Sequence, residues 1–329
     1  MKLLFLFTGG TIGSTTRESV MATEEGKSYR ILRAYGERYG ISFEYEVSEP
    51  YTELSENCTG KHLRALVLAV KRGLAESYDG IVVTHGTDTL QYSAAAVGYC
   101  IGSDTVPVCF VSANAPIEDP ASNGLANLHG AIRFIEQSGG RGAFVSYRNG
   151  GSEAVQIHRA TRLLESRAFS DEVVSVRNAP YGAVDREGRF AKNPAYGERA
   201  DAISPLSCEN LSEVNEATLT LIPRTGIRYP EIPDGVKYVI MGTYHSGTLD
   251  TKSEAARRFY LEAKEKGVAV LATGTYGGAK YESATHFEEL GICPVPDLSP
   301  VAAYVKLWVA DSVGIDPIAV LNQPLGGDL

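Results

Sequence analysis

The first half of the chain alternates between short apolar runs and segments with helical spacing. The apolar runs cover residues 3–8, 41–47, 80–84, 106–112 and 143–147, and the helix-like segments cover 30–40, 62–75, 88–101 and 125–137. Strands that alternate with helices in this way are typical of βαβ units, in which parallel strands form a sheet covered on both faces. The pattern therefore predicts an α/β fold with a mostly parallel sheet.

A polar, Gly- and Pro-containing segment interrupts this pattern and indicates a second domain. Gly188, Pro194, Gly197 and Pro205 break the periodicity, which then resumes with strand-like runs at 217–222, 238–242 and 268–273 and helix-like runs at 253–266 and 300–310. A length of 329 residues also favours two domains at roughly 150 residues each. We predict a larger N-terminal α/β domain over 1–187, a linker over 188–212 and a smaller C-terminal α/β domain over 213–329.

Charge and cysteine content exclude several classes of protein. The chain has 31 basic and 40 acidic side chains, and the net charge of −9 argues against nucleic acid or an anionic membrane as a partner. The apolar run at 3–7 is too short for a signal peptide, and no stretch reaches the ~18 apolar residues of a membrane helix. Five scattered cysteines without a CxxC pair indicate free thiols, a cytoplasmic location and no metal site.

Two of the predicted strands end in turns rich in hydroxyl groups and glycine. The first turn is Thr8-Gly9-Gly10-Thr11-Ile12-Gly13, and the second is Thr84-His85-Gly86-Thr87-Asp88-Thr89. Ligands of open parallel sheets bind at the carboxyl ends of the strands. Glycine lets the main chain approach a ligand closely, and free backbone N–H groups there can hold a carboxylate or an oxyanion. The two turns therefore predict a binding or catalytic site.

Simpler explanations exist for each turn alone. The Gly-Gly pair could be a tight connection; a phosphate site is disfavoured because neither GxGxxG nor GxxxxGK[ST] occurs. Asp88, with Thr87 beside it, could cap the helix that follows, as Asp and Thr commonly do. A nucleophilic hydroxyl would in addition need a group that activates it. The two turns together are more informative than either alone.

These turns resemble the two signatures of the bacterial-type L-asparaginase family, TGGTI at Thr8–Ile12 and THGTDT at Thr84–Thr89. The resemblance spans essentially the whole chain and extends to 107–116, 123–128 and 281–307. It implies hydrolysis of the side-chain amide of asparagine to aspartate and ammonia, without a metal or an organic cofactor. In that family Thr11 would be the acylated nucleophile, and Thr87 and Asp88 would form a second catalytic group together with a lysine.

The resemblance also assigns substrate-binding residues. Asp88 and the Ser55-Glu56 pair would bind the α-amino and α-carboxylate groups of an amino-acid substrate. Backbone at Gly10, at Gly86-Thr87 and at Ala113 would contact the oxyanion and the amide. An ordinary polar loop is the alternative explanation for Ser55-Glu56.

The sequence departs from the family pattern at three places. Arg162, within the Thr161-Arg162 pair, aligns with the expected lysine, and an arginine stays protonated and cannot act as a base. Tyr29 is the candidate for the tyrosine of the loop after Thr11, although it could simply pack at the start of the next helix. Asn114-Ala115-Pro116 replaces the usual Met-Arg-Pro. These departures concern rate and substrate choice more than the fold.

Three functions compete on this basis. The leading hypothesis is a cytoplasmic asparaginase that acts as a homodimer or homotetramer on a small amino-acid substrate. The second is a relative that binds asparagine, aspartate or a related amide with little turnover, which Arg162 motivates. The third is the related amidotransferase component that supplies ammonia to a tRNA-bound substrate; the acidic charge and the start of the chain directly at the first strand disfavour it.

Overall fold

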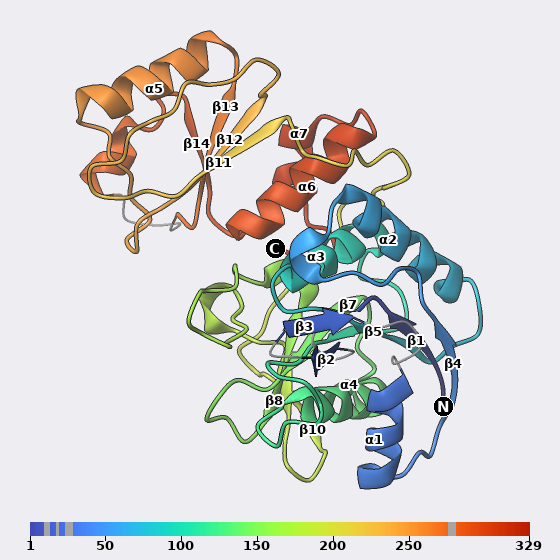
Figure 1. Ribbon diagram of the computed structural model, residues 1–329. Coiled ribbons are helices and arrows are strands. Elements are labelled where there is room, and N and C mark those ends of the chain that lie inside the picture. Colours follow the sequence, from blue (N-terminus) through green and yellow to red (C-terminus); the bar gives the residue numbers. More distant parts are fainter. Residues whose placement is uncertain (10–13, 18–19, 24–28, 276–280) are drawn as a thin grey trace.

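The computed structural model describes residues 1–9, 14–17, 20–23, 29–275 and 281–329. A large sheet has the strand order β10-β9-β8-β7-β6-β5-β1-β4 (Figure 1). Its strands are β1 (Lys2–Phe7), β4 (Glu44–Ser48), β5 (Gly80–Thr84), β6 (Val108–Val111), β7 (Ala143–Tyr147), β8 (Val155–Arg159), β9 (Gly182–Val184) and β10 (Phe190–Lys192). The strands from β4 to β7 pair in parallel, whereas β8, β9 and β10 pair antiparallel.

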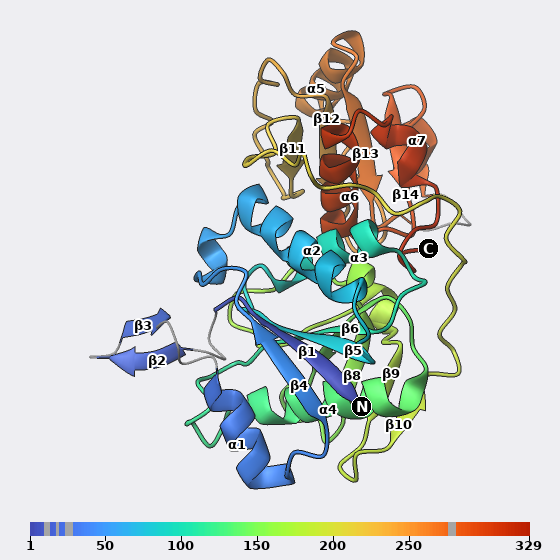
Figure 2. The same ribbon diagram turned by 90° about the vertical axis from the view of Figure 1, so that its right-hand side faces the viewer.

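Helices cover both faces of this sheet. Helices α1 (Tyr29–Tyr39) and α4 (Gly124–Ser138) lie on one face, and α2 (Gly60–Leu74) and α3 (Leu90–Ile101) lie on the other (Figures 1 and 2). Strand β1 shows why: Leu3 and Phe5 pack toward α1 and α4, while Leu4 and Leu6 pack toward α2 and α3. A strand buried on both faces needs an apolar side chain at every position, which accounts for the continuous apolar runs.

A smaller, all-parallel sheet has the order β11-β12-β13-β14. Its elements are β11 (Thr218–Leu221), β12 (Tyr238–Gly242), α5 (Glu254–Glu265), β13 (Ala269–Thr273), β14 (Ile292–Val295), α6 (Pro300–Ser312) and α7 (Pro317–Leu321). Helix α6 lies between this sheet and α3 (Figure 1), so nine of its residues are buried around its whole circumference. Figure 2 shows the hairpin of β2 (Ser14–Arg17) and β3 (Val20–Thr23) projecting from the body.

The predicted fold class is confirmed: an α/β chain with a mostly parallel sheet and a smaller α/β unit. Strands β5, β7 and β12 have the predicted bounds. The sequence did not predict β8 to β10, and the large sheet continues to Lys192, inside the predicted linker. The division at 1–187, 188–212 and 213–329 stays a prediction. No helix among the described residues is both long and apolar enough to cross a membrane.

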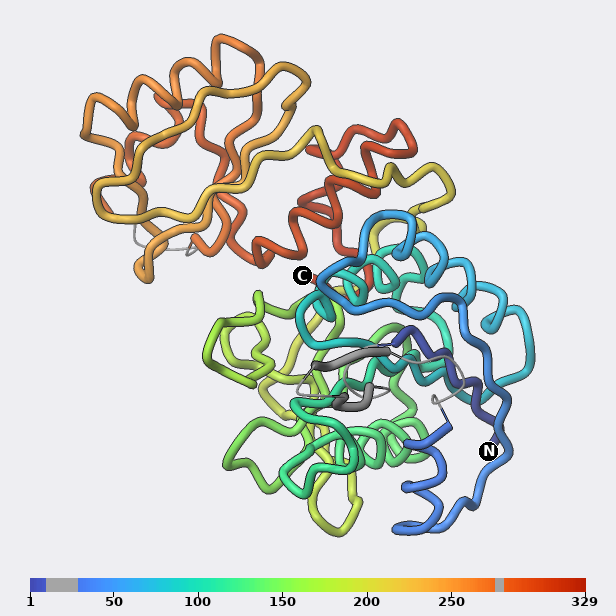
Figure 3. The backbone as a smooth tube through the Cα atoms, in the orientation of Figure 1, coloured from blue at the N-terminus to red at the C-terminus, as the bar shows by residue number. Residues whose placement is uncertain are grey.

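The last eight residues, the C-terminal tail (322–329), return to the large sheet (Figure 3). The tail contacts the 3₁₀ turn η3 (Ala160–Arg162), where the Thr161 hydroxyl donates to the Gly326 carbonyl at 2.9 Å. The Arg199 amide donates to the Leu329 carbonyl at 2.7 Å, and the Gly326 amide donates to the Asp201 carboxylate at 2.8 Å. The tail therefore fastens the C-terminal part of the chain to the N-terminal sheet.

Candidate active site

The two signature turns lie side by side because their strands are neighbours in the large sheet. Phe7 pairs with Thr84 in the parallel register of β1 and β5. Beyond this pair, the Thr8 hydroxyl donates to the Thr84 carbonyl at 2.7 Å, and both side chains are buried. Thr8 thus fixes the separation of the two turns, a role that the motif residue alone did not suggest.

Gly9 holds the first turn against a neighbouring segment. It forms a bridge with Glu53, and the Glu53 amide donates to the Thr8 carbonyl at 3.1 Å. Gly9 has φ +93°, and a Cβ atom there would lie 2.5 Å from the Glu53 carbonyl oxygen. The position therefore requires glycine for both its conformation and its close contact.

We expect Gly9→Ala to destabilise the protein more than Gly40→Ala. Both positions have positive φ, which costs about 1–3 kcal/mol for a residue with a side chain, but a Cβ at Gly40 meets nothing within 4 Å. The excess loss at Gly9 measures the clash with Glu53. Urea unfolding of the two variants checks this expectation, and equal losses would contradict it.

The second turn connects to the Ser55 segment, which begins the 3₁₀ turn η2 (Ser55–Asn57). The Ser55 hydroxyl donates to the Asp88 carboxylate at 3.3 Å, and the Thr89 hydroxyl donates to the Ser55 carbonyl at 2.8 Å. Ser55 is buried, Thr87 is half-buried and Asp88 is exposed. The structure therefore brings Ser55 and Asp88 together, as the family resemblance implies, and leaves the Asp88 carboxylate accessible to a ligand.

The capping explanation for Asp88 does not describe this turn. Thr89, not Asp88, is the N-cap residue of α3, and its side chain makes no capping hydrogen bond. The Asp88 main-chain carbonyl instead accepts from the Gln91 amide at 3.0 Å. Helix formation leaves the Asp88 carboxylate free for another contact.

The other predicted site residues occupy the same edge of the sheet with different exposure. Gly86 is buried in the second turn, Ala113 is fully buried just after β6, and Glu56 is exposed in η2. His85 is buried and pairs through Nδ1 with the Gly86 carbonyl at 2.8 Å. Burial lowers the pKa of His85 to about 4, so this imidazole is neutral at pH 7 and supports the turn as an uncharged group.

Three predicted residues concern the first turn and its loop. Gly10 and Thr11 lie outside the described residues. Tyr29 is the first residue of α1, is 52% exposed, and has its ring centroid 6.4 Å from that of Phe7, at the end of β1. Tyr29 thus packs at the start of the helix, on the edge of the sheet where the first turn begins.

Arg162 faces the C-terminal tail. Its Nε donates to the Gly327 carbonyl at 2.8 Å and its Nη1 donates to the Gly197 carbonyl at 2.9 Å. The guanidinium also lies over the Tyr196 ring, 4.9 Å from the centroid. These contacts show a structural role and do not direct Arg162 to Asp88, because a tail that no local pattern reveals takes up its donors.

Ser166 is the side chain from this segment that contacts the second turn. Its hydroxyl lies 3.3 Å from the Thr87 carbonyl oxygen and 3.2 Å from the Gln91 side-chain oxygen. Within the described part of the chain, no lysine or arginine nitrogen lies within 4.0 Å of the Asp88 carboxylate. No pattern in the sequence indicated Ser166, since an uncharged residue outside any motif carries no signal.

We expect Arg162→Lys to lower stability without raising any amidase activity. Lysine cannot keep two directed hydrogen bonds and a stacked face at once, and each lost bond costs about 1 kcal/mol. Urea unfolding and an ammonia-release assay on the same preparation test both parts. A rise in ammonia release would show that residue 162 acts on the site.

Among the described residues, no group of three or more His, Cys, Asp or Glu side chains could hold a metal ion. The chemistry that these residues offer is that of hydroxyl groups, a carboxylate and main-chain donors. They define an α/β protein with a polar site at the carboxyl edge of a parallel sheet.

Comparisons with known proteins specify the family. The family model described as "Asparaginase, N-terminal" matches residues 2–196, which is more than half of the 329 residues. The chain belongs to the asparaginase family.

Its relatives carry two different names. The L-asparaginase of Thermococcus kodakarensis is 27% identical, over 94% of this chain and 92% of the relative. A subunit of the glutamyl-tRNA(Gln) amidotransferase of Methanosarcina acetivorans is 31% identical, over 94% of this chain and 74% of the relative. A Haloquadratum walsbyi protein of the same name is 28% identical, over 98% of this chain and 74% of the relative.

Solved structures share the whole fold. The thermostable L-asparaginase from Thermococcus kodakarensis superposes with a TM-score of 0.79 at 23% identity, covering 100% of this chain and 99% of that one. L-asparaginase I from Vibrio cholerae has a TM-score of 0.76 at 19% identity, covering 100% and 98%. At these identities the likeness shows the fold.

Proposed function

We propose that this protein hydrolyses the side-chain amide of L-asparagine to L-aspartate and ammonia. The observation that carries the proposal is the Ser55–Asp88 pair at the exposed carboxyl edge of the sheet, beside the turn that leads into Thr11. An exposed carboxylate held by a buried hydroxyl suits the α-ammonium group of an amino acid.

In the proposed mechanism, the Thr11 hydroxyl attacks the carbonyl carbon of the amide. The C–O bond forms as the proton leaves the hydroxyl, and main-chain N–H groups near Gly86 and Ala113 stabilise the tetrahedral oxyanion. The C–N bond then breaks and the protonated nitrogen leaves as ammonia. Water hydrolyses the resulting ester to aspartate and restores the hydroxyl. Thr87 would orient the amide, and Tyr29 stays a candidate for assisting Thr11.

The second candidate function is binding of asparagine, aspartate or a related amide with little turnover. The absence of a cation within 4.0 Å of Asp88, among the described residues, favours it. Without a nearby amine, proton transfer at the second turn relies on neutral hydroxyl groups such as those of Thr87 and Ser166.

The decisive experiment measures ammonia release from L-asparagine and L-glutamine by the wild-type protein and by Thr11→Ala. We expect release by the wild type and none above background by Thr11→Ala. Equal release from both proteins would overturn the hydrolase. If neither protein turns over, a rise in melting temperature with aspartate supports the binding protein, and no rise overturns both functions.

Partners and compartment are further parts of the proposal. We propose a homodimer or homotetramer in the cytoplasm, because the five cysteines are unpaired thiols and one structural neighbour is described as a "Probable Cytoplasmic L-asparaginase". Several relatives are named as subunits of an amidotransferase, so a protein partner is the competing assembly. Light scattering of the purified chain tests the homo-oligomer, and a monomer would contradict it.

A further inference from the structure

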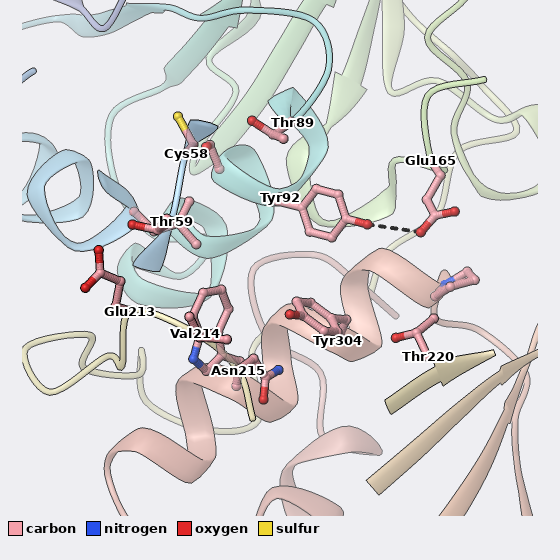
Figure 4. Close-up of a pocket in the computed structure, with 14 residues that line it drawn as sticks. Cys58, Thr59, Thr89, Tyr92, Glu165, Glu213, Val214, Asn215, Thr220 and Tyr304 are labelled. Carbon is pink, nitrogen blue, oxygen red and sulfur yellow. Dashed lines mark hydrogen bonds between the residues drawn. The ribbon is translucent and has the colours of Figure 1, made fainter. Parts of the chain in front are cut away.

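A pocket of about 530 Å³ lies between the two sheets' helical layers and is separate from the face of Asp88 just described. It lies between α3 and α6 and is closed on one side by the segment 213–215 (Figure 4). Its floor is aromatic: the Tyr92 and Tyr304 rings meet edge-on at 5.8 Å, and the Tyr304 and Trp308 rings lie 5.9 Å apart. Nothing in the proposed hydrolysis uses this pocket.

Two carboxylates stand at different sides of the pocket. Figure 4 shows Glu165 on one side and Glu213 on the other, with the Tyr304 and Tyr92 rings between them. The Tyr92 hydroxyl donates to Glu165 at 3.0 Å. For the residues that the structure describes, neither glutamate has a lysine or arginine nitrogen within 4.0 Å. The pocket therefore carries two negative charges without basic partners.

Buried polar atoms in the wall give a second, independent sign of a ligand. Ser93 is fully buried and lines the pocket, yet its hydroxyl has no hydrogen-bond partner among the described residues. The side-chain nitrogen of Asn215 is likewise buried without a partner in that part of the chain. Because buried polar groups in folded proteins are nearly always hydrogen-bonded, these two atoms indicate a polar occupant.

We propose that this pocket binds an aliphatic diamine, a flexible chain of methylene groups with an ammonium group at each end. One ammonium group would pair with Glu165 and the other with Glu213. The methylene chain would pack on the aromatic floor, where the ring faces also attract the cations. A zwitterion or an anion fits poorly, because the pocket offers its charged groups as carboxylates alone.

The pocket adjoins the reverse side of the turn that carries Asp88. Thr89 lines the pocket, and its hydroxyl holds the Ser55 carbonyl at 2.8 Å. Ser55 in turn donates to Asp88 at 3.3 Å. An occupant that shifts Thr89 would change the position of the substrate-binding pair, so a bound diamine is expected to change KM more than kcat.

Isothermal titration calorimetry with 1,5-diaminopentane tests the proposal. We expect saturable binding by the wild type, weaker binding of the monoamine 1-aminopentane, and a loss of about fivefold in affinity for each of Glu165→Gln and Glu213→Gln, in line with a partly exposed ion pair. Glu265→Gln, at the exposed end of α5, is the matched control and should bind as the wild type does.

Equal affinity for the diamine and the monoamine, or unchanged affinity in the double variant Glu165→Gln/Glu213→Gln, would overturn the proposal. Circular dichroism of each variant ensures that a loss of binding does not reflect unfolding. Binding is measured without turnover, so its failure leaves the proposed hydrolase untouched, and failure of the hydrolase leaves the diamine site testable.

Discussion

Thr87→Val is expected to lower the rate of ammonia release by at least about 100-fold, with the fold retained. Valine has the shape of threonine but lacks the hydroxyl, and a group that transfers or donates a proton in the transition state contributes typically 10²–10⁴-fold. Thr87 is half-buried at the carboxyl end of β5, beside the Ser55–Asp88 pair. The test is the steady-state rate with saturating asparagine, together with the melting temperature.

Thr105→Val is the control for this substitution. The Thr105 hydroxyl is buried without a hydrogen-bond partner among the described residues, and Thr105 precedes β6 at the opposite end of the strands from the site. Removing that hydroxyl should leave both the rate and the melting temperature close to those of the wild type. A Thr87→Val enzyme with the rate of Thr105→Val would show that the second turn only shapes the site.

The parts of the fold that the sequence predicted are those in which burial acts on every residue. Strands β5 and β7 are buried on both faces, so Gly80–Thr84 and Ala143–Tyr147 read as unbroken runs without charged residues and have the predicted bounds. Strand β8 was missed because Gln156, His158 and Arg159 give it a polar sequence. Arg159 is nevertheless buried, since Glu198 pairs with it at 2.6 Å from 39 positions along the chain.

The same limit explains the candidate site. The two turns were predictable because each motif is contiguous and each follows an evident strand. Arg162 was not, because its partner Gly327 is 165 positions away and the tail carries no periodic pattern. The Thr89–Ser55 bond, over 34 positions, was equally invisible. Local pattern identifies the elements, whereas the sharing of donors and acceptors depends on which distant segments meet.

The C-terminal tail provides the prediction with the largest effect on stability. Lys306 in α6 and Asp328 in the tail form an ion pair at 2.7 Å, and both side chains are fully buried. The ammonium group also donates to the Gln323 carbonyl at 2.6 Å, and the other Asp328 oxygen accepts from the Leu325 amide at 2.9 Å. We expect Lys306→Met to lower the free energy of unfolding by about 3–5 kcal/mol, because it leaves a buried carboxylate without its cation.

A surface pair is the control. Lys252 and Glu282 lie 2.9 Å apart with side chains 69% and 74% exposed, so Lys252→Met should cost no more than about 1 kcal/mol. Urea unfolding at pH 7 measures both losses. A loss for Lys306→Met as small as that for Lys252→Met would mean that water reaches the buried pair.

The double variant Lys306→Met/Asp328→Leu separates the value of the pair from the cost of breaking it. Burial lowers the pKa of Lys306 and raises the pKa of Asp328, against the attraction between them, which indicates that the pair does not fully offset its own desolvation. Replacing both charges by apolar side chains should therefore recover most of the stability that Lys306→Met loses. If the double variant is as unstable as the single one, the tail is held by the ion pair itself, and its loss should free Arg162 and Thr161 from their contacts with Gly327 and Gly326.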